Sequence, residues 1–108
     1  MEKQLIYISG PISHRDPTER RKAFAATAAM LRAKGFDVVN PMENGLPENS
    51  PTHAHMRRDF EMLMCCDIIY MMKGWTHSKG CKVEFDVATA IGMSFMFQET
   101  GLETFKFE

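Results

Sequence analysis

The side chains best suited to chemistry in this sequence are two carboxylates and a phenol, Glu84, Asp59 and Tyr7. Glu84 is expected in the first turn of a helix, on the same helical line as Ala88 and Ile91. Partial desolvation beside apolar groups would raise its pKa and its reactivity, which suits a nucleophile or an acid–base catalyst. A glutamate in a first helical turn also complements the helix dipole, and position alone leaves both interpretations open.

The other two groups also have structural interpretations. Asp59 follows Arg57 and Arg58, so it could form a surface ion pair of little energetic value or tilt towards a ligand crevice. Tyr7 is near the end of the apolar run 5–8, where its hydroxyl could enter a site while its ring fills the core. Asp67 directly precedes another apolar run, and there we favour a structural role in a turn.

Two loops offer the hydroxyls, backbone N–H groups and positive charge that bind phosphate. They are 10–13 and 78–80, and neither contains a phosphate-binding or dinucleotide-binding glycine fingerprint. Trp75 is the one large apolar side chain in the loop 73–80, and it could stack on a planar base or anchor the loop. The candidate ligand-binding residues are therefore Ser9, Gly10, Pro11, Ile12, Ser13, Trp75, Ser78 and Gly80.

The four histidines and three cysteines invite a metal hypothesis, which we reject. The pair His53 and His55 has no C-x-x-C or H-E-x-x-H spacing to support it, so we predict no metal and no cofactor. Cys65 and Cys66 are adjacent at the end of an apolar helical run, where a disulfide is implausible. We expect reduced, buried thiols.

These groups must be positioned by alternating elements. We expect strands at 5–8, 36–40, 68–72 and 94–97 and helices at 17–34, 52–66 and 81–91. The tail after Gln98 could add a fifth strand.

The alternation is typical of an α/β fold, a flavodoxin-like or Rossmann-like three-layer sandwich with a parallel sheet of four or five strands in the order 2-1-3-4. Ligands then bind at the carboxyl ends of strands one and three, which loops 9–16 and 73–80 face. The segment 41–53 is long enough to act as a lid or binding loop.

Length and charge narrow the class of protein. A chain of 108 residues is expected to form a single domain, 1–108. A formal charge of −1 provides no attraction to nucleic acid polymers or to anionic membranes, so a small molecule is the expected partner. No stretch is long enough to span a membrane or to act as a signal peptide, which predicts a cytoplasmic protein.

Three motifs, in this order and spacing, resemble those of the nucleoside 2-deoxyribosyltransferase superfamily over about residues 5–97. They are Ile6-Tyr7-Ile8-Ser9-Gly10-Pro11, then Arg58-Asp59-Phe60-Glu61 with Asp67, then Ser78-x-Gly80-x-x-x-Glu84 followed by Ala88 and Gly92.

The resemblance implies cleavage of an N-glycosidic bond with retention of configuration. Glu84 would attack C1′ and form a covalent glycosyl-enzyme, Asp59 would protonate the leaving base, and Tyr7 would orient Glu84. Water as the acceptor makes the protein a hydrolase, and a second base makes it a transferase. The family also implies a homodimer or a larger homo-oligomer.

Ser78 helps to choose the substrate. Six residues before the nucleophile, transferases of this family carry an aspartate, whereas the 5′-monophosphate N-hydrolases resemble this chain in having serine. A carboxylate would repel a phosphate, while a hydroxyl at a helix N-terminus beside Lys79 would bind one. The resemblance therefore favours hydrolysis of a nucleoside or deoxynucleoside 5′-monophosphate, with base exchange on deoxynucleosides and a non-catalytic nucleotide-binding or sensing module as alternatives.

Overall fold

The computed structural model describes residues 3–99 and 102–106, with side chains described for 3–98. Strands and α-helices alternate from the start, and two short 3-10 helices, η1 and η2, lie in the loops. In chain order the elements are β1 (Leu5–Ser9), α1 (Pro17–Ala33), β2 (Asp37–Val39), η1 (Pro41–Glu43), α2 (Thr52–Leu63), β3 (Ile68–Met71), η2 (Trp75–His77), α3 (Lys79–Ala90), β4 (Ser94–Glu99) and β5 (Leu102–Lys106).

The strands form one sheet in the order β2-β1-β3-β4-β5. The first four strands pair in parallel, which confirms the predicted order 2-1-3-4. The strand expected from the tail is present, but it pairs with β4 antiparallel. Only residues 100–101 separate the two strands, and a parallel pairing would need a crossover of a dozen or more residues.

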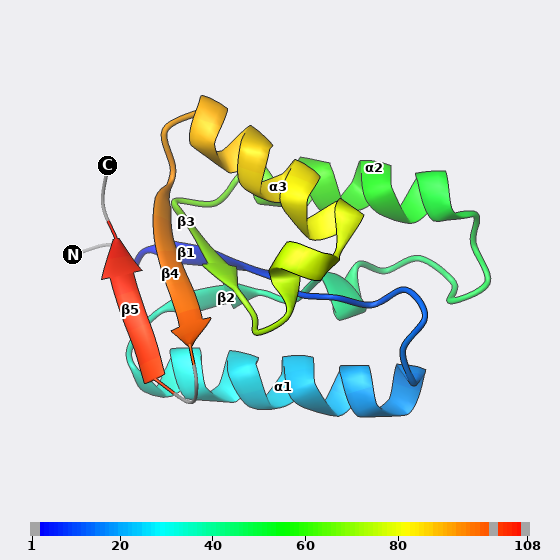
Figure 1. Cartoon of the computed structure of the whole chain (residues 1–108), viewed down its shortest axis with the longest axis horizontal. Helices are drawn as coiled ribbons and strands as arrows, with labels where there is room; N and C mark the ends of the chain where they lie inside the picture. The colour runs from blue at the N-terminus through cyan, green and yellow to red at the C-terminus, as the bar shows by residue number, and fades with distance from the viewer. Residues whose placement is uncertain (1–2, 100–101, 107–108) are drawn as a thin grey trace.

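Helices cover both faces of the sheet, as predicted for a three-layer sandwich. In Figure 1, α1 lies below the sheet, and α2 and α3 lie above it. Side chains alternate along β1. Ile6 and Ile8 therefore join the apolar cluster between the sheet and α1, while Tyr7 joins the cluster between the sheet and the helices α2 and α3. The same alternation directs Ser9, at the carboxyl end of the strand, towards α3.

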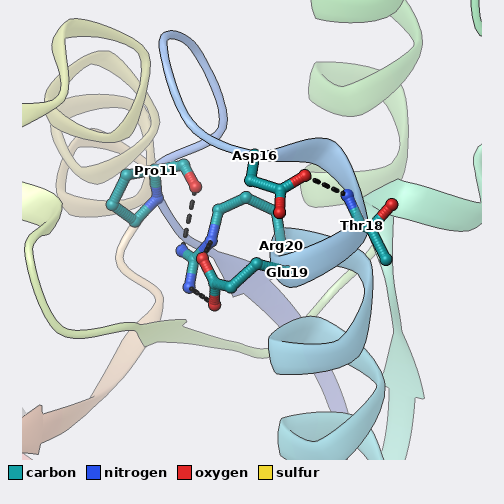
Figure 2. A network of polar contacts seen from close by, with 5 residues as sticks. All are labelled: Pro11, Asp16, Thr18, Glu19 and Arg20. Carbon is teal, nitrogen blue, oxygen red and sulfur yellow. Dashed lines mark hydrogen bonds and ion pairs between the residues drawn. The ribbon is translucent and has the colours of Figure 1, made fainter.

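The loop between β1 and α1 is fixed by a buried arginine. Figure 2 shows Arg20 donating through Nη1 to the carbonyl of Pro11 at 3.0 Å while it pairs with both carboxylate oxygens of Glu19. Asp16 caps the helix by accepting from the backbone N–H of Thr18 at 3.1 Å. The loop that enters the predicted crevice is therefore tied to the first turn of α1.

Two helix boundaries differ from the sequence prediction by more than one residue. Helix α3 begins at Lys79 rather than at residue 81, because the Ser78 hydroxyl caps it by accepting from the N–H of Cys81 at 3.3 Å. Glu84 therefore lies in the second helical turn, not the first. Helix α2 ends at Leu63, three residues earlier than expected.

The early end of α2 changes what its last residues contact. Cys65 is exposed rather than buried as predicted, whereas Cys66 and Cys81 are buried, and all three thiols are free. Leu63, the last residue of the helix, is fully buried, whereas the next residue, Met64, is 60% exposed. None of the described helices combines the length and apolar character needed to cross a membrane.

Candidate active site

The carboxylate of Glu84 lies against the carboxyl end of β1, and hydroxyl groups of that strand bind both of its oxygens. The phenol of Tyr7 donates to Oε2 at 2.6 Å, and the Ser9 hydroxyl donates to Oε1, also at 2.6 Å. Tyr7 and Ser9 are both buried, with 0% and 1% of their surface exposed. This clamp, formed by strand alternation on one side and the second turn of α3 on the other, excludes the interpretation that Glu84 only complements the helix dipole.

Burial dominates the electrostatics of this clamp. Desolvation raises the pKa of Glu84, the hydrogen bonds from Ser9 and Tyr7 act in the opposite direction, and the charge of Asp59 raises it further. Burial and the neighbouring Glu84 raise the pKa of Tyr7 well above its ordinary value. The phenol therefore remains a hydrogen-bond donor, and Glu84 is a desolvated carboxylate with a fixed orientation.

Asp59, on α2, belongs to the same site. Its charge raises the pKa of both Glu84 and Tyr7, which places the three groups within electrostatic reach of one another. Asp59 is half-buried, and desolvation raises its own pKa while a hydrogen bond of 3.2 Å from the amide of Asn44 lowers it. Within residues 3–98 no ion pair joins Asp59 to an arginine, so the surface-pair interpretation is wrong.

In the first loop, two of the predicted ligand-binding residues, Gly10 and Pro11, are held by packing and hydrogen bonding within the protein. A Cβ on Gly10 would lie 2.5 Å from the sulfur of Met72 and 3.0 Å from the ring of Phe24, so close packing requires glycine there. The carbonyl of Pro11 is already bound by Arg20. The next two residues, 12 and 13, are exposed. Of this loop and the strand end before it, only Ser9 contacts Glu84.

In the second loop, the structure favours the anchoring interpretation of Trp75. Its ring packs on Phe85 and Phe97 with centroid distances of 4.9 and 6.0 Å. The Ser78 hydroxyl is at the N-terminus of α3, where it caps the helix. A Cβ on Gly80 would meet nothing within 4 Å, so this helix start is open.

Arg15 brings positive charge from the first loop to the second. Its Nη2 lies 3.8 Å from the position that a Cβ on Gly74 would occupy. Its charge also lowers the pKa of the Cys81 thiol, in the first turn of α3, although burial raises that pKa overall. The guanidinium is therefore close to the N-terminal end of α3.

Asp67 contrasts with Glu84, because its carboxylate serves the backbone. Its Oδ2 accepts from the N–H of Leu5 at 3.0 Å, at the opposite end of β1, which agrees with the structural role expected from the sequence. Two surface hollows, of about 420 and 500 Å³, lie beside α1 and are not lined by Tyr7, Asp59 or Glu84. The candidate site is thus defined by its polar side chains. The described part of the chain holds no group of three or more His, Cys, Asp or Glu side chains that could bind a metal ion.

Sequence reasoning missed two features of this site. Ser9 was predicted to contact ligand, and its hydrogen bond to Glu84 was not predicted; the period of two that links Ser9 to Tyr7 was a signal for that shared face. Asn44 was not singled out at all, because it lies in an irregular loop whose position depends on tertiary packing.

The chain belongs to the family described as a domain of unknown function, DUF4406, whose sequence profile matches residues 4–97. No curated protein matches it.

Solved structures with the same fold include the following three. They are a CMP N-glycosidase from Clostridium botulinum (18% identity, TM-score 0.61), a conserved protein from Enterococcus faecalis (21%, 0.68) and a 2-desoxiribosyltransferase from Leishmania mexicana (21%, 0.67). The matches cover 87%, 89% and 87% of this chain, but 67%, 63% and 63% of those chains. This chain therefore spans about two thirds of the length of each, and the likeness concerns the fold.

Proposed function

We propose that this protein is an N-glycosidase that cleaves the base–sugar bond of a nucleoside 5′-monophosphate through a covalent intermediate on Glu84. The observation that carries the proposal is the clamp on Glu84: Tyr7 and Ser9 bind its two oxygens, and Asp59 is within electrostatic reach. Two proteins with the same fold, a CMP N-glycosidase and a 2-desoxiribosyltransferase by name, support this class of reaction.

The two carboxyl groups can divide the chemistry because their surroundings differ. Burial raises the pKa of both groups, and the charge of Asp59 raises that of Glu84 further, which favours a state with one of the two groups protonated. Glu84 accepts two short hydroxyl hydrogen bonds, which stabilise its ionised form, whereas Asp59 accepts one longer bond from Asn44. We therefore assign the charge to Glu84 and the proton to Asp59.

The reaction then proceeds in two balanced steps. A Glu84 oxygen bonds to C1′ as the C1′–N bond breaks, the bonding pair goes to the base nitrogen, and the proton of Asp59 neutralises it. Water next attacks C1′ while Asp59 accepts a proton from it, which releases the sugar 5′-phosphate and restores Glu84.

The N-terminal end of α3 is the proposed site for the 5′-phosphate. Ser78 caps this helix, the start of the helix has room around Gly80, and Arg15 lies close to it. Helix N-termini with nearby cations bind phosphate through backbone N–H groups and charge. Trp75, half-buried on its aromatic neighbours, is proposed to border the nucleoside end of the site.

Base release from a panel of nucleotides tests the proposal. Deoxy- and ribonucleoside 5′-monophosphates and the matching nucleosides are incubated with the protein, and free base is quantified by chromatography. We expect base release from monophosphates in preference to nucleosides, and none from the variant Glu84→Ala, which should still bind ligand. Binding without release by the wild type would contradict the glycosidase and favour a nucleotide-binding or sensing module.

Base exchange is the second candidate, favoured by the likeness to a 2-desoxiribosyltransferase. It differs only in the acceptor, because a second base replaces water in the second step. Adding a different free base to a deoxynucleoside reaction distinguishes the two. A new nucleoside, formed faster than the sugar is released to water, would identify a transferase.

Self-association is a further expectation that we carry as a proposal. Met56 on α2 and Met64 directly after the helix are 39% and 60% accessible, and exposed apolar side chains of this size are suited to a contact between copies. Light scattering of the purified protein measures the oligomeric state directly.

A further inference from the structure

Asn44, in the loop between η1 and α2, has every polar atom of its side chain committed. Its Oδ1 accepts from the backbone N–H of Leu46 at 3.0 Å. Its Nδ2 lies 3.2 Å from Oδ1 of Asp59 and 3.0 Å from Nδ1 of His55. Because the backbone bond fixes which end of the amide is oxygen, both amide hydrogens must point towards the two residues of α2.

The fixed amide determines the role of His55. Its Nδ1 faces a donor, so it must accept, and the ring proton is then on Nε2. That nitrogen is buried and has no hydrogen-bond partner among the described residues. Burying an unpaired donor is unfavourable. The hydrogen bond to Asn44 is therefore the polar contact that the buried ring of His55 makes among the described residues.

The fixed amide also distinguishes the two oxygens of Asp59. Oδ1 accepts from Asn44, and an oxygen that accepts this bond is the poorer place for the proton of a neutral carboxyl group. The proton of Asp59 is therefore directed to Oδ2. The remaining groups facing Asp59 are His55, one turn earlier on α2, Glu84 from α3 and Tyr7 from β1.

We propose that Asn44, held by His55, is a positioning residue that keeps the transferable proton of Asp59 on Oδ2 in one fixed orientation. The proposal rests on the proposed function, in which that proton passes from Asp59 to the base nitrogen as the C1′–N bond breaks. Proton transfer is efficient only from a donor held within hydrogen-bond reach of its acceptor, so a carboxyl group free to rotate would transfer its proton more slowly.

The same contacts give a measurable signature. The hydrogen bond from Asn44 lowers the pKa of Asp59, against the effect of burial. Without the amide, the pKa of Asp59 rises and the acid is held more tightly. The alkaline limb of the activity profile, where Asp59 loses its proton, then moves to higher pH, whereas a merely structural role would leave it in place.

The experiment uses two matched asparagine variants of the full chain. Asn44→Ser keeps an oxygen near the N–H of Leu46 but cannot reach α2. Asn40→Ser makes the same change at a neighbouring asparagine, whose Oδ1 accepts from the N–H of Met42 at 3.0 Å. The carboxyl carbon of Asp59 is titrated by NMR in the wild type and both variants, and the pH profile of base release is recorded in parallel.

We expect Asn44→Ser to raise the pKa of Asp59, to move the alkaline limb upwards and to lower kcat about tenfold, part of the roughly 10²–10⁴-fold that acid catalysis supplies. Asn40→Ser should leave the titration of Asp59 and the limb unchanged. His55→Phe, which retains Asn44, should shift both in the same direction by less.

The inference is overturned if Asp59 titrates identically in Asn44→Ser and the wild type, or if Asn40→Ser shifts it equally. Failure of the proposed function looks different. In that case the wild type releases no base from any nucleotide, while the NMR titration, which needs no turnover, still shows whether Asn44 controls the proton of Asp59.

Discussion

The two faces of the sheet are built from the same strands but serve different ends. Under α1 the buried side chains are almost entirely apolar, a cluster of Ile6, Ile8, Phe24, Ala28, Leu31, Ile68, Tyr70, Met72 and Met96. Under α2 and α3 an apolar cluster covers most of the face, but at the carboxyl end of β1 it gives way to hydroxyls and carboxylates. Strand β1 contributes to both faces, because its alternate residues point to opposite sides of the sheet.

The difference shows how a small domain divides stability and chemistry. The α1 face removes apolar surface from water, which is the main favourable contribution to folding. The other face buries two carboxyl groups whose pKa values are raised, so folding disfavours their ionised forms. Destabilising the ionised carboxylates makes Glu84 and Asp59 more reactive. The apolar surface buried between the sheet and α1 offsets this cost to the stability of the fold.

The largest expected effect is on the polar face. Glu84→Gln keeps the shape of the side chain but removes the nucleophile, and its NH2 group cannot accept one of the two hydrogen bonds that Tyr7 and Ser9 donate to the carboxylate. We expect base release to fall by on the order of 10⁴-fold or more, with nucleotide binding retained. Single-turnover assays and calorimetric titration check the two halves of this prediction. A variant that keeps a tenth of the activity would exclude a covalent role for Glu84.

The apolar face should respond in the opposite way, through stability alone. Phe24, on α1, is fully buried against the sheet, and Phe24→Ala should lower the free energy of unfolding by about 3–5 kcal/mol. The nucleotide affinity of the folded fraction should not change. Phe85→Ala is the matched change on the other face, where Phe85 supports Trp75 at 4.9 Å, and it should weaken binding as well. Urea unfolding and titration of both variants test the division; equal losses of affinity would remove it.

Local sequence patterns predicted the order of elements well and their ends less well. The alternation of apolar runs and helical periods suffices for strand order 2-1-3-4, because crossover chirality and neighbour rules leave few topologies. The start of α3 was misplaced because residues 78–80 have the composition of a loop, although Ser78 is the cap of the helix. From the local sequence alone, a serine followed by lysine and glycine can be either a loop residue or a helix N-cap.

The candidate site was predictable to a similar depth. The resemblance and the crevice rule together named Tyr7, Asp59 and Glu84, which the structure brings together. Asn44 and the inward turn of Asp59 were not predictable, because they depend on how an irregular loop packs on α2. No local pattern encodes that packing.

A smaller effect on activity is expected from removing a tyrosine hydroxyl, and it should differ between Tyr7 and Tyr70, which lie on opposite faces of the sheet. Tyr7→Phe removes a hydrogen bond to a charged group, worth about 1.5–3 kcal/mol, so kcat should fall about ten- to a hundredfold. The pKa of Glu84 should rise, since that bond lowers it, and the acidic limb of the activity profile should move to higher pH. Tyr70→Phe, a change of the same size in the cluster under α1, should leave the limb in place. Both profiles are measured by base release across pH, and a shift in the Tyr70 variant would contradict the assignment.

The smallest expected effect is the pH dependence of stability. Glu84 and Asp59 have pKa values raised above their ordinary 4.5 and 3.8, so the folded chain keeps protons that the unfolded chain loses. Their contribution to stability is therefore complete below about 3.8 and is lost as the pH rises through the raised values.

Glu84→Gln should flatten that decline, because glutamine has no proton to lose. Phe24→Ala should run parallel to the wild type, since cavity formation does not depend on pH. Exposed groups such as Glu19, whose pKa the neighbouring Arg20 lowers, titrate equally in all three proteins and cancel in the comparison. Denaturant unfolding of the three proteins between pH 3 and 8 gives the free energy of unfolding as a function of pH. If this free energy changed with pH equally in the wild type and Glu84→Gln, Glu84 would not be desolvated by folding.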